Sequence, residues 1–229
     1  MTVLSACQDA CLRLLGRKPA TIYSDTTFAE IGQLANETAE DIAKSHDWQA
    51  LRVLYTLTGD GSTTSYSLPD DYDRLLINAY VQSTRSRIPL ARARDQNQWL
   101  DFLVSAVLAY PGYWIILGGQ MQILPALGSS ETAKFYYMTT KWAADSGGTA
   151  KTSFEADTDV FRLPERLLRL GLIWRYRQRK GLEYGEDMAN YEKAFAQEAA
   201  RDRGVGTFGI GRSRLPPDAT VAYPGVIIP

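Results

Sequence analysis

Three side chains in this chain of 229 residues have the chemistry of metal ligands, or of a nucleophile and its base: Cys7, Cys11 and His46. Cys7 and Cys11 are four residues apart, so on a helix they share one face. One helical turn holds two sulfurs too awkwardly for a disulfide. A tetrahedral metal site needs four ligands, and no second cysteine pair completes one. We therefore expect two reduced, apolar thiols in a helical core stripe, and no metal or other cofactor.

A nucleophilic hydrolase needs a base beside its serine or cysteine, and His46 is the only histidine in the sequence. It stands at a predicted helix end beside Trp48, where a histidine more often caps the last carbonyls. Residues 204–209 match the dinucleotide pattern G-x-G-x-x-G, but that site needs a strand before it and a helix after it. Here a predicted helix precedes the motif and a proline-rich segment follows. We expect the protein not to be an enzyme.

Asp70, Asp71 and Asp73 form an acidic cluster of the kind that holds metal ions in some nucleases. No Glu-x-Lys pattern or companion histidine supports that interpretation. The cluster follows Pro69 at the end of a predicted strand, where Asp side chains commonly hydrogen-bond the backbone two residues on. We interpret it as a turn.

The composition is that of one folded domain with an appendage: 45% of the residues are hydrophobic, 22% are charged, and the formal net charge is −1. This charge gives no overall signal for binding nucleic acid. No signal peptide, and no apolar run of about 18 residues that could cross a bilayer, is evident. We expect no membrane anchor, and synthesis and assembly in a cytosol-like environment, the cytoplasm.

The local charge is uneven. Residues 162–180 hold seven basic residues and one acid, whereas residues 183–202 hold six acids and two bases. The two segments could pair as an antiparallel hairpin within one chain, or between neighbouring copies around a ring. A basic helix facing DNA in a channel is a third interpretation. The candidate residues for contact between subunits or with the channel are Arg175, Arg177, Arg179, Lys180, Glu183, Glu186 and Asp187.

Hydrophobic periodicity predicts helices at both ends of the chain. One spans 3–15 and stops at Gly16, and a second runs to about residue 45 behind a capping box formed by Thr27 and Glu30. A third follows Pro164, placed at its first position, and stops at Gly181. A fourth continues from residue 184 to about 204.

Alternation and turn residues predict strands between these helix pairs. A strand at 51–58 is joined by the turn 59–61 to a hairpin partner at 62–68. Further strands are expected at 74–82, 87–91 and 131–142, with a short helix at 95–107. Residues 113–117 and 121–124 around Gly118-Gly119 form the clearest hairpin. Residues 143–159 are small and polar, and are typical of a flexible loop.

The predicted fold class is α+β: a four-helix bundle built from the N- and C-terminal helix pairs, with an inserted antiparallel β-rich region and an extended C-terminal tail. The expected segments are 1–50 and 161–204 for the helix pairs, 51–142 for the β insertion, 143–160 for the loop and 205–229 for the tail.

The tail, 205–229, is rich in Gly and Pro, has no helical or alternating period, and ends in the apolar sequence YPGVIIP. Apolar residues of this kind favour docking onto another chain, although a tail folded back on its own body, or a disordered one, is also compatible with the composition. The candidate docking residues are Phe208, Ile210, Leu215, Pro216, Pro217, Tyr223, Pro224, Val226, Ile227 and Ile228.

Three motifs in this order carry a resemblance to a known family: HDWQAL at 46–51, LPDDYDR at 68–74 and KGLEYGED at 180–187. Over residues 1–203 the chain resembles the head-to-tail adaptor proteins of tailed bacteriophages, especially podovirus-like ones. The resemblance implies a non-enzymatic virion protein of the neck, forming a dodecameric ring under the portal protein. It also implies that the ring extends the DNA channel, with DNA only as transiting cargo, and receives the tail nozzle or tube.

Two other functions remain open on the sequence. A tail-tube or tail-completion ring shares the β-rich, ring-forming character but attaches lower in the particle. A DNA-binding or nuclease accessory protein would use the arginines of 162–180 to contact phosphates.

Overall fold

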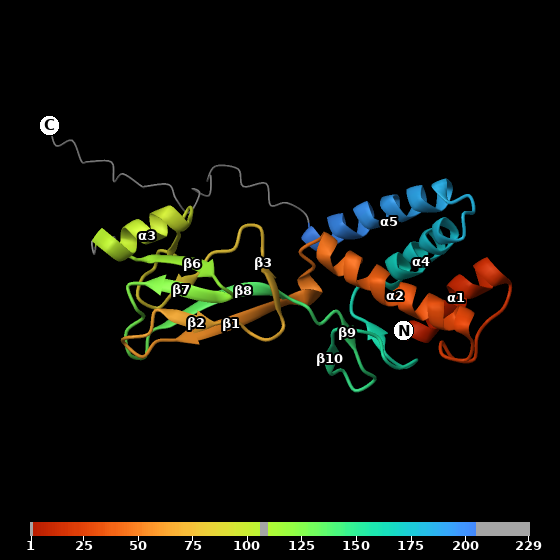
Figure 1. Cartoon of the computed structure of the whole chain (residues 1–229), viewed down its shortest axis with the longest axis horizontal. Helices are drawn as coiled ribbons and strands as arrows, with labels where there is room; N and C mark the ends of the chain where they lie inside the picture. The colour runs from red at the N-terminus through yellow and green to blue at the C-terminus, as the bar shows by residue number, and fades with distance from the viewer. Residues whose placement is uncertain (1, 106–109, 205–229) are drawn as a thin grey trace. The chain divides into compact units, whose positions relative to one another are not determined.

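A computed structural model describes residues 2–105 and 110–204 of the chain (Figure 1). The fold is α+β, as expected, with helices and mostly antiparallel strands. The described residues divide into two compact units: 2–53, 70–77 and 137–204 form the first, and 54–69, 78–105 and 110–136 form the second. Among the described helices, none is both long enough and apolar enough to cross a membrane.

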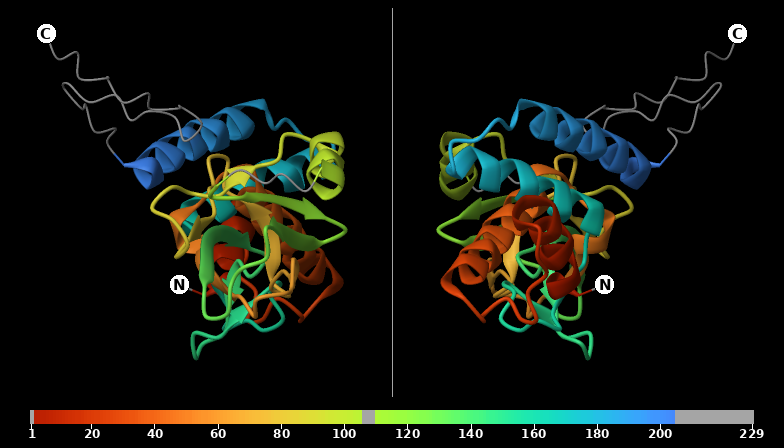
Figure 2. Two further views of the ribbon diagram at one scale, coloured as in Figure 1. Left: turned by 90° about the vertical axis from the view of Figure 1, so that its left-hand side faces the viewer. Right: turned by 90° about the vertical axis from the view of Figure 1, so that its right-hand side faces the viewer.

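The first unit contains four helices: α1 (Val3–Leu15), α2 (Thr26–Ser45), α4 (Glu165–Arg179) and α5 (Gly185–Arg203). Figures 1 and 2 show α4 lying between α5 on one side and α1 and α2 on the other. Each helix turns an apolar stripe toward this arrangement, as the 3–4 spacing predicts. The stripe of α2 is completely buried along its length: Phe28, Ile31, Leu34, Ala35, Ala39 and Ile42.

The ends of α1 and the stop of α4 at Gly181 follow the local sequence, but the starts of α2 and α4 do not. Gly16 ends α1 in the left-handed conformation, at a φ of 69°. The predicted capping box of α2 is wrong, because the helix begins at Thr26 with Asp25 as its N-cap, one residue earlier than expected. Pro164 is likewise the N-cap of α4 and not its first helical residue.

A small three-stranded sheet lies where a loop was expected. It pairs β9 (Ala143–Ala144) with β10 (Ala150–Lys151) and β11 (Val160–Phe161). The carboxylate of Asp159, 1% exposed, accepts hydrogen bonds from the backbone N–H groups of Glu155 and Ala156 at 2.7 and 2.9 Å. The polar composition predicted a flexible loop. The hydrogen bonds between Asp159 and the backbone of 155–156 hold part of this segment in a fixed conformation, and composition does not reveal such bonds.

A second sheet has the strand order β1-β8-β3, with β4 also paired to β8. Its strands are β1 (Arg52–Thr58, after the 3-10 turn η1, Gln49–Leu51), β3 (Tyr72–Leu75), β4 (Gln82–Ser83) and β8 (Thr132–Thr139). The single strand expected at 74–82 is therefore wrong: β3 and β4 pair with different parts of β8, and the residues between them leave the sheet.

The second unit holds the sheet β2-β7-β6-β5 and helix α3. Its elements are β2 (Ser65–Ser67), β5 (Ala91–Arg92), α3 (Gln96–Ser105), β6 (Tyr113–Leu117) and β7 (Gln120–Leu124). The predicted hairpin of β6 and β7 is confirmed, with Gly118 and Gly119 at positive φ of 58° and 75°. Trp99 of α3 and Ile115 of β6 are buried together beneath the helix.

The hairpin predicted between β1 and 62–68 is wrong, because β2 pairs with β7. The backbone of the intervening turn bonds elsewhere: Gly59 N–H donates to Glu131 O and Gly61 N–H to Leu127 O. The carboxylate of Asp60 also accepts from the N–H groups of Ser62 and Thr63, which redirects the chain.

Candidate functional site

Cys7 and Cys11 lie on the buried face of α1 as free thiols. Burial raises the pKa of the Cys7 thiol to about 12, with Cys11 and Asp157 adding to the effect, and raises that of Cys11 to about 11. At neutral pH both are therefore protonated, which makes them poor nucleophiles and poor metal ligands. Within residues 2–105 and 110–204 no group of three or more His, Cys, Asp or Glu side chains could hold a metal ion.

His46 ends α2 and is almost buried. Its Nε2 lies 3.3 Å from the Asp202 carboxylate at the end of α5, and its ring meets Trp48 edge-on at 4.8 Å. Asp202 also accepts a hydrogen bond from the backbone N–H of Gln49 at 3.1 Å. The hydrogen bond from Gln49 fastens the end of α5 to the turn after α2. His46 Nε2 faces the Asp202 carboxylate without a hydrogen bond inside the described part of the chain, and its neighbour is a carboxylate and not a nucleophile.

The acidic cluster also has structural partners, although not those expected. Asp71 accepts hydrogen bonds from the hydroxyls of Tyr137 at 2.8 Å and Thr139 at 2.7 Å, and not from the backbone two residues on. Burial opposes ionisation of Asp71, but these two hydrogen bonds and the positive charge of Lys141 together lower the pKa of the carboxyl. Asp73 pairs with its neighbour Arg74. The cluster thus joins β3 to the end of β8.

Five of the seven predicted charge residues form ion pairs across the helices of the first unit. Asp187, in the first turn of α5, is 3% exposed and lies 2.5 Å from the guanidinium of Arg177 and 2.9 Å from that of Arg13. Its carboxylate therefore joins α5 to α4 and α1. The N-terminal end of a helix also favours a negative charge.

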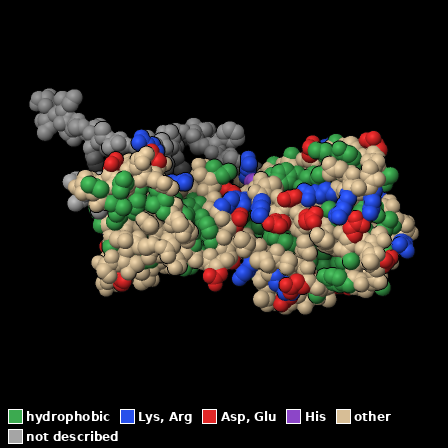
Figure 3. All heavy atoms as spheres, viewed as in Figure 1, with side chains coloured by type: hydrophobic (Ala, Val, Ile, Leu, Met, Phe, Trp, Pro, Cys, Tyr) green, Lys and Arg blue, Asp and Glu red, His purple; other side chains and the backbone are tan. Residues whose placement is uncertain are grey.

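The other three basic candidates pair with acids of α2. Arg179 and Lys180 both contact Glu30, at 3.2 and 3.0 Å, and Arg175 contacts Asp41 at 2.5 Å. Figure 3 accordingly shows basic and acidic side chains side by side over α2 and α4. Glu30 was expected to cap its own helix, and its carboxylate instead receives two cations from α4 and the residue that follows it.

The acidic candidates divide into two groups. Asp187 takes part in these ion pairs, whereas Glu186 is exposed and makes no ion pair within the part of the chain that the structure describes. Glu183 accepts a hydrogen bond from Gly185 N–H at 3.2 Å. Sequence patterning missed Arg13, Glu30 and Asp41 as partners, since no spacing along the chain relates them to α4 or α5.

The tail candidates, from Phe208 to Ile228, and all but the first residue of the 204–209 glycine motif lie outside the described residues. The structure describes α5 and Gly204 before them. The docking role of the tail stays a prediction.

Comparison with protein families gives one finding for nearly the whole chain. The family model described as SU10 adaptor protein matches residues 1–220. The match includes every described helix and strand and extends beyond the three motifs, which end at residue 187. Comparison with curated proteins gives no match.

Proposed function

Because the chain belongs to the SU10 adaptor protein family, whose members are structural adaptor proteins of bacteriophage virions, we propose that it is the head-to-tail adaptor of its particle. In this role it forms a dodecameric ring beneath the portal protein, extends the DNA channel and carries the tail nozzle or tube. The observation that carries the proposal is the family match over residues 1–220.

The first unit suits the body of such a subunit. Helices α1, α2 and α5 each pack against α4, and ion pairs from Asp187, Glu30 and Asp41 cross the contacts between helices. Pairs of this kind fix orientation more than they add stability. Because four of the five basic residues of α4 have acidic partners in their own chain, we propose that these four orient the helices, and that the channel wall is not strongly basic. A weakly attractive wall lets DNA pass.

The protein acts without catalysis in this proposal. The thiols of Cys7 and Cys11 are buried and protonated, and His46 faces a carboxylate. The tail, 205–229, docks on the portal or on a neighbouring copy through its apolar residues.

Removing the gene from the phage tests the role. Heads that fill with DNA but carry no tails, and that regain tails when the purified chain is added, would support an adaptor. Normal tailed particles without the chain would refute it. Truncation after Gly204 separately tests the tail: unchanged incorporation into particles would exclude the tail as a docking segment.

Co-purification separates the adaptor from the second candidate, a tail-tube ring. An adaptor binds isolated portal, whereas a tube protein binds the nozzle or polymerises. A DNA-binding accessory protein would instead bind duplex DNA with an affinity that falls steeply with salt.

A further inference from the structure

Helix α3 of the second unit has apolar side chains on two faces, and only one of these faces is covered. Trp99 and Phe102 pack against the sheet of that unit. Leu100, Leu103 and Val104 point elsewhere and are 57, 57 and 77% exposed. Their i, i+3, i+4 spacing puts these three side chains on one stripe, the outer face of α3. Figure 3 shows apolar side chains gathered over α3.

The outer face of α3 has the character of a contact surface for protein. Single apolar side chains are common on protein surfaces, but neighbouring ones that form a patch mark interaction sites. The one charged residue of α3 is Asp101, which is exposed and has no ion pair within the described part of the chain. A helix that lies on a membrane surface typically carries Lys and Arg on its polar face, and α3 carries neither. These features favour an apolar protein segment with positive charge nearby.

The tail, 205–229, is a segment of this kind in the same sequence. Its stretch 223–228, YPGVII, contributes one aromatic and three aliphatic side chains within six residues. The tail also contains two arginines and one aspartate, so its net charge is +1, whereas residues 96–105 of α3 carry −1. The tail and the helix therefore match both in apolar character and in charge.

The tail is also long enough to leave its own subunit. Residues 205–222 separate the last described residue, Gly204, from the apolar stretch. At about 3.3 Å per residue, these residues span up to about 60 Å when extended. This length is about twice the diameter of a small domain, roughly 30 Å. In a ring, one surface of each copy meets a different surface of the next, and each chain supplies one tail and one α3.

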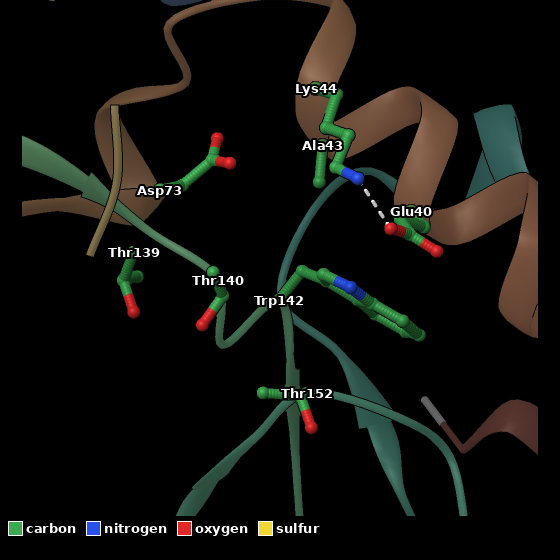
Figure 4. Close-up of a pocket in the computed structure, with 8 residues that line it drawn as sticks. All are labelled: Glu40, Ala43, Lys44, Asp73, Thr139, Thr140, Trp142 and Thr152. Atoms are coloured by element: carbon green, nitrogen blue, oxygen red, sulfur yellow. Dashed lines mark hydrogen bonds and ion pairs between the residues drawn. The ribbon is translucent and has the colours of Figure 1, made fainter. Parts of the chain in front are cut away.

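The small pocket of the first unit, shown in Figure 4, offers no comparable surface for the tail. Its volume is about 180 Å³, and the acids on its walls are already paired, Glu40 with Lys44 and Asp73 with Arg74. Its aromatic residue, Trp142, is only 5% exposed. The outer face of α3 is therefore the better acceptor for an apolar segment.

We propose that the apolar stretch 223–228 of one copy packs on the outer face of α3 of a second copy. The opposite charges of the tail and the helix favour their encounter. The inference deepens the proposed adaptor ring and rests on it, because it assigns one contact between neighbouring subunits. The family match ends at residue 220, so the contact is assigned to this chain and not to its family.

Cysteine cross-linking in assembled particles identifies what the tail contacts. One full-length variant carries Val104→Cys and another carries Ile227→Cys, while the native Cys7 and Cys11 are buried. Oxidation of particles assembled from both variants should give a product of twice the 25.5 kDa of one chain. Neither variant alone should give it. As a control, Glu37→Cys, exposed on α2, replaces Val104→Cys and should give no such product.

A matched pair of substitutions on α3 supplies the second measurement. Leu103→Asp places a charge within the outer face and should lower incorporation into particles about tenfold or more, because a charge covered by apolar side chains has no partner. Ser105→Asp adds the same charge to the same helix outside the stripe and should not. Equal melting temperatures of the two variants exclude a folding defect. If Leu103→Asp melts lower, Ile227→Asp, which changes no described residue, provides the measurement instead.

Several results would overturn the contact and leave the adaptor role intact. One is that particles containing both cysteine variants yield no joined product, or a product with another virion protein. Another is a bond formed only within a chain that carries both cysteines, which would place the tail on its own body. Equal incorporation of Leu103→Asp and Ser105→Asp is a third. Tailed particles that lack the chain altogether would instead refute the proposed function.

Discussion

The carboxylate of Asp187 lies 2.5 Å from the guanidinium of Arg177, and the two residues belong to consecutive helices of opposite charge. The same carboxylate lies 2.9 Å from Arg13 at the other end of the chain. Asp187 is buried, while both arginines remain partly exposed. The side chain of Asp187 therefore connects α1, α4 and α5. At this position the basic helix α4 and the acidic helix α5 pair within one chain, and not between neighbouring copies.

Replacing Asp187 by Asn should destabilise the protein by about 2 kcal/mol, because two charge-assisted contacts are lost and an amide is left between two cations. Chemical denaturation measures the loss as a lower midpoint. The adjacent Glu186→Gln is the control: Glu186 is exposed, and its change should stay within about 0.5 kcal/mol. Equal effects at the two positions would contradict the role of Asp187.

Gly171 of α4 lies against Thr38 of α2. A Cβ at this position would lie 2.5 Å from Cγ2 of Thr38. Overpacking of this kind costs about 1–3 kcal/mol and exceeds the gain of about 1 kcal/mol in helix propensity, so Gly171→Ala should lower the melting temperature.

A second substitution, at Thr38, checks whether its methyl group causes the loss of stability in Gly171→Ala. Thr38→Ser removes Cγ2 and keeps the hydroxyl that donates to Leu34 O. In that background Gly171→Ala should become neutral or stabilising. A loss of the same size in both backgrounds would show that Thr38 is not the obstacle.

Cys7 should make stability fall at alkaline pH. Its pKa is about 12 in the folded chain and near 9.0 when exposed, so the folded state keeps a proton that the unfolded state releases. The contribution is complete below pH 9 and is lost as the pH rises toward 12. Denaturation of the wild type and of Cys7→Ala between pH 8 and 11 should give a smaller alkaline decline in the variant. Rapid reaction of the native Cys7 thiol with a disulfide reagent at pH 8 would argue against this burial.

Asp71 should act in the opposite pH range. Its carboxyl has a lowered pKa in the folded chain, so its contribution is present above the usual carboxyl range and is lost as the pH falls through the folded value. Asp71→Asn should be less stable near neutral pH, by about 1–3 kcal/mol, and should lose less stability on acidification. Asp70→Asn, at an exposed position, is the control and should follow the wild type.

Much of the secondary structure could be predicted because its signals are local. The glycine that ends α1, the apolar stripe of α2 and the Gly-Gly turn between β6 and β7 each act within a few residues of the element they define. The burial of both cysteines follows from the same 3–4 periodicity, since one face of α1 is apolar throughout.

Pairings between distant segments could not be predicted in this way. Nothing in the spacing of 59–68 shows that β2 pairs with β7, because strand partners are chosen by the packing of whole sheets. Glu30 has the local pattern of a helix cap, yet its carboxylate has two cations from near α4 within reach. The backbone N–H of Thr27, three residues before Glu30, is a weaker partner for this carboxylate than the two cations that folding brings close to it.

The opposed charges of residues 162–180 and 183–202 belong to the amino-acid sequence itself, and so does the presence of two thiols and one histidine. Which acid each arginine meets was decided only by the tertiary structure. Ion pairs form between whichever groups the packing of the helices brings within about 4 Å, and that packing is set by the apolar faces and not by the charges. The sequence therefore determined the charges, and the position of α4 between its neighbours determined their partners.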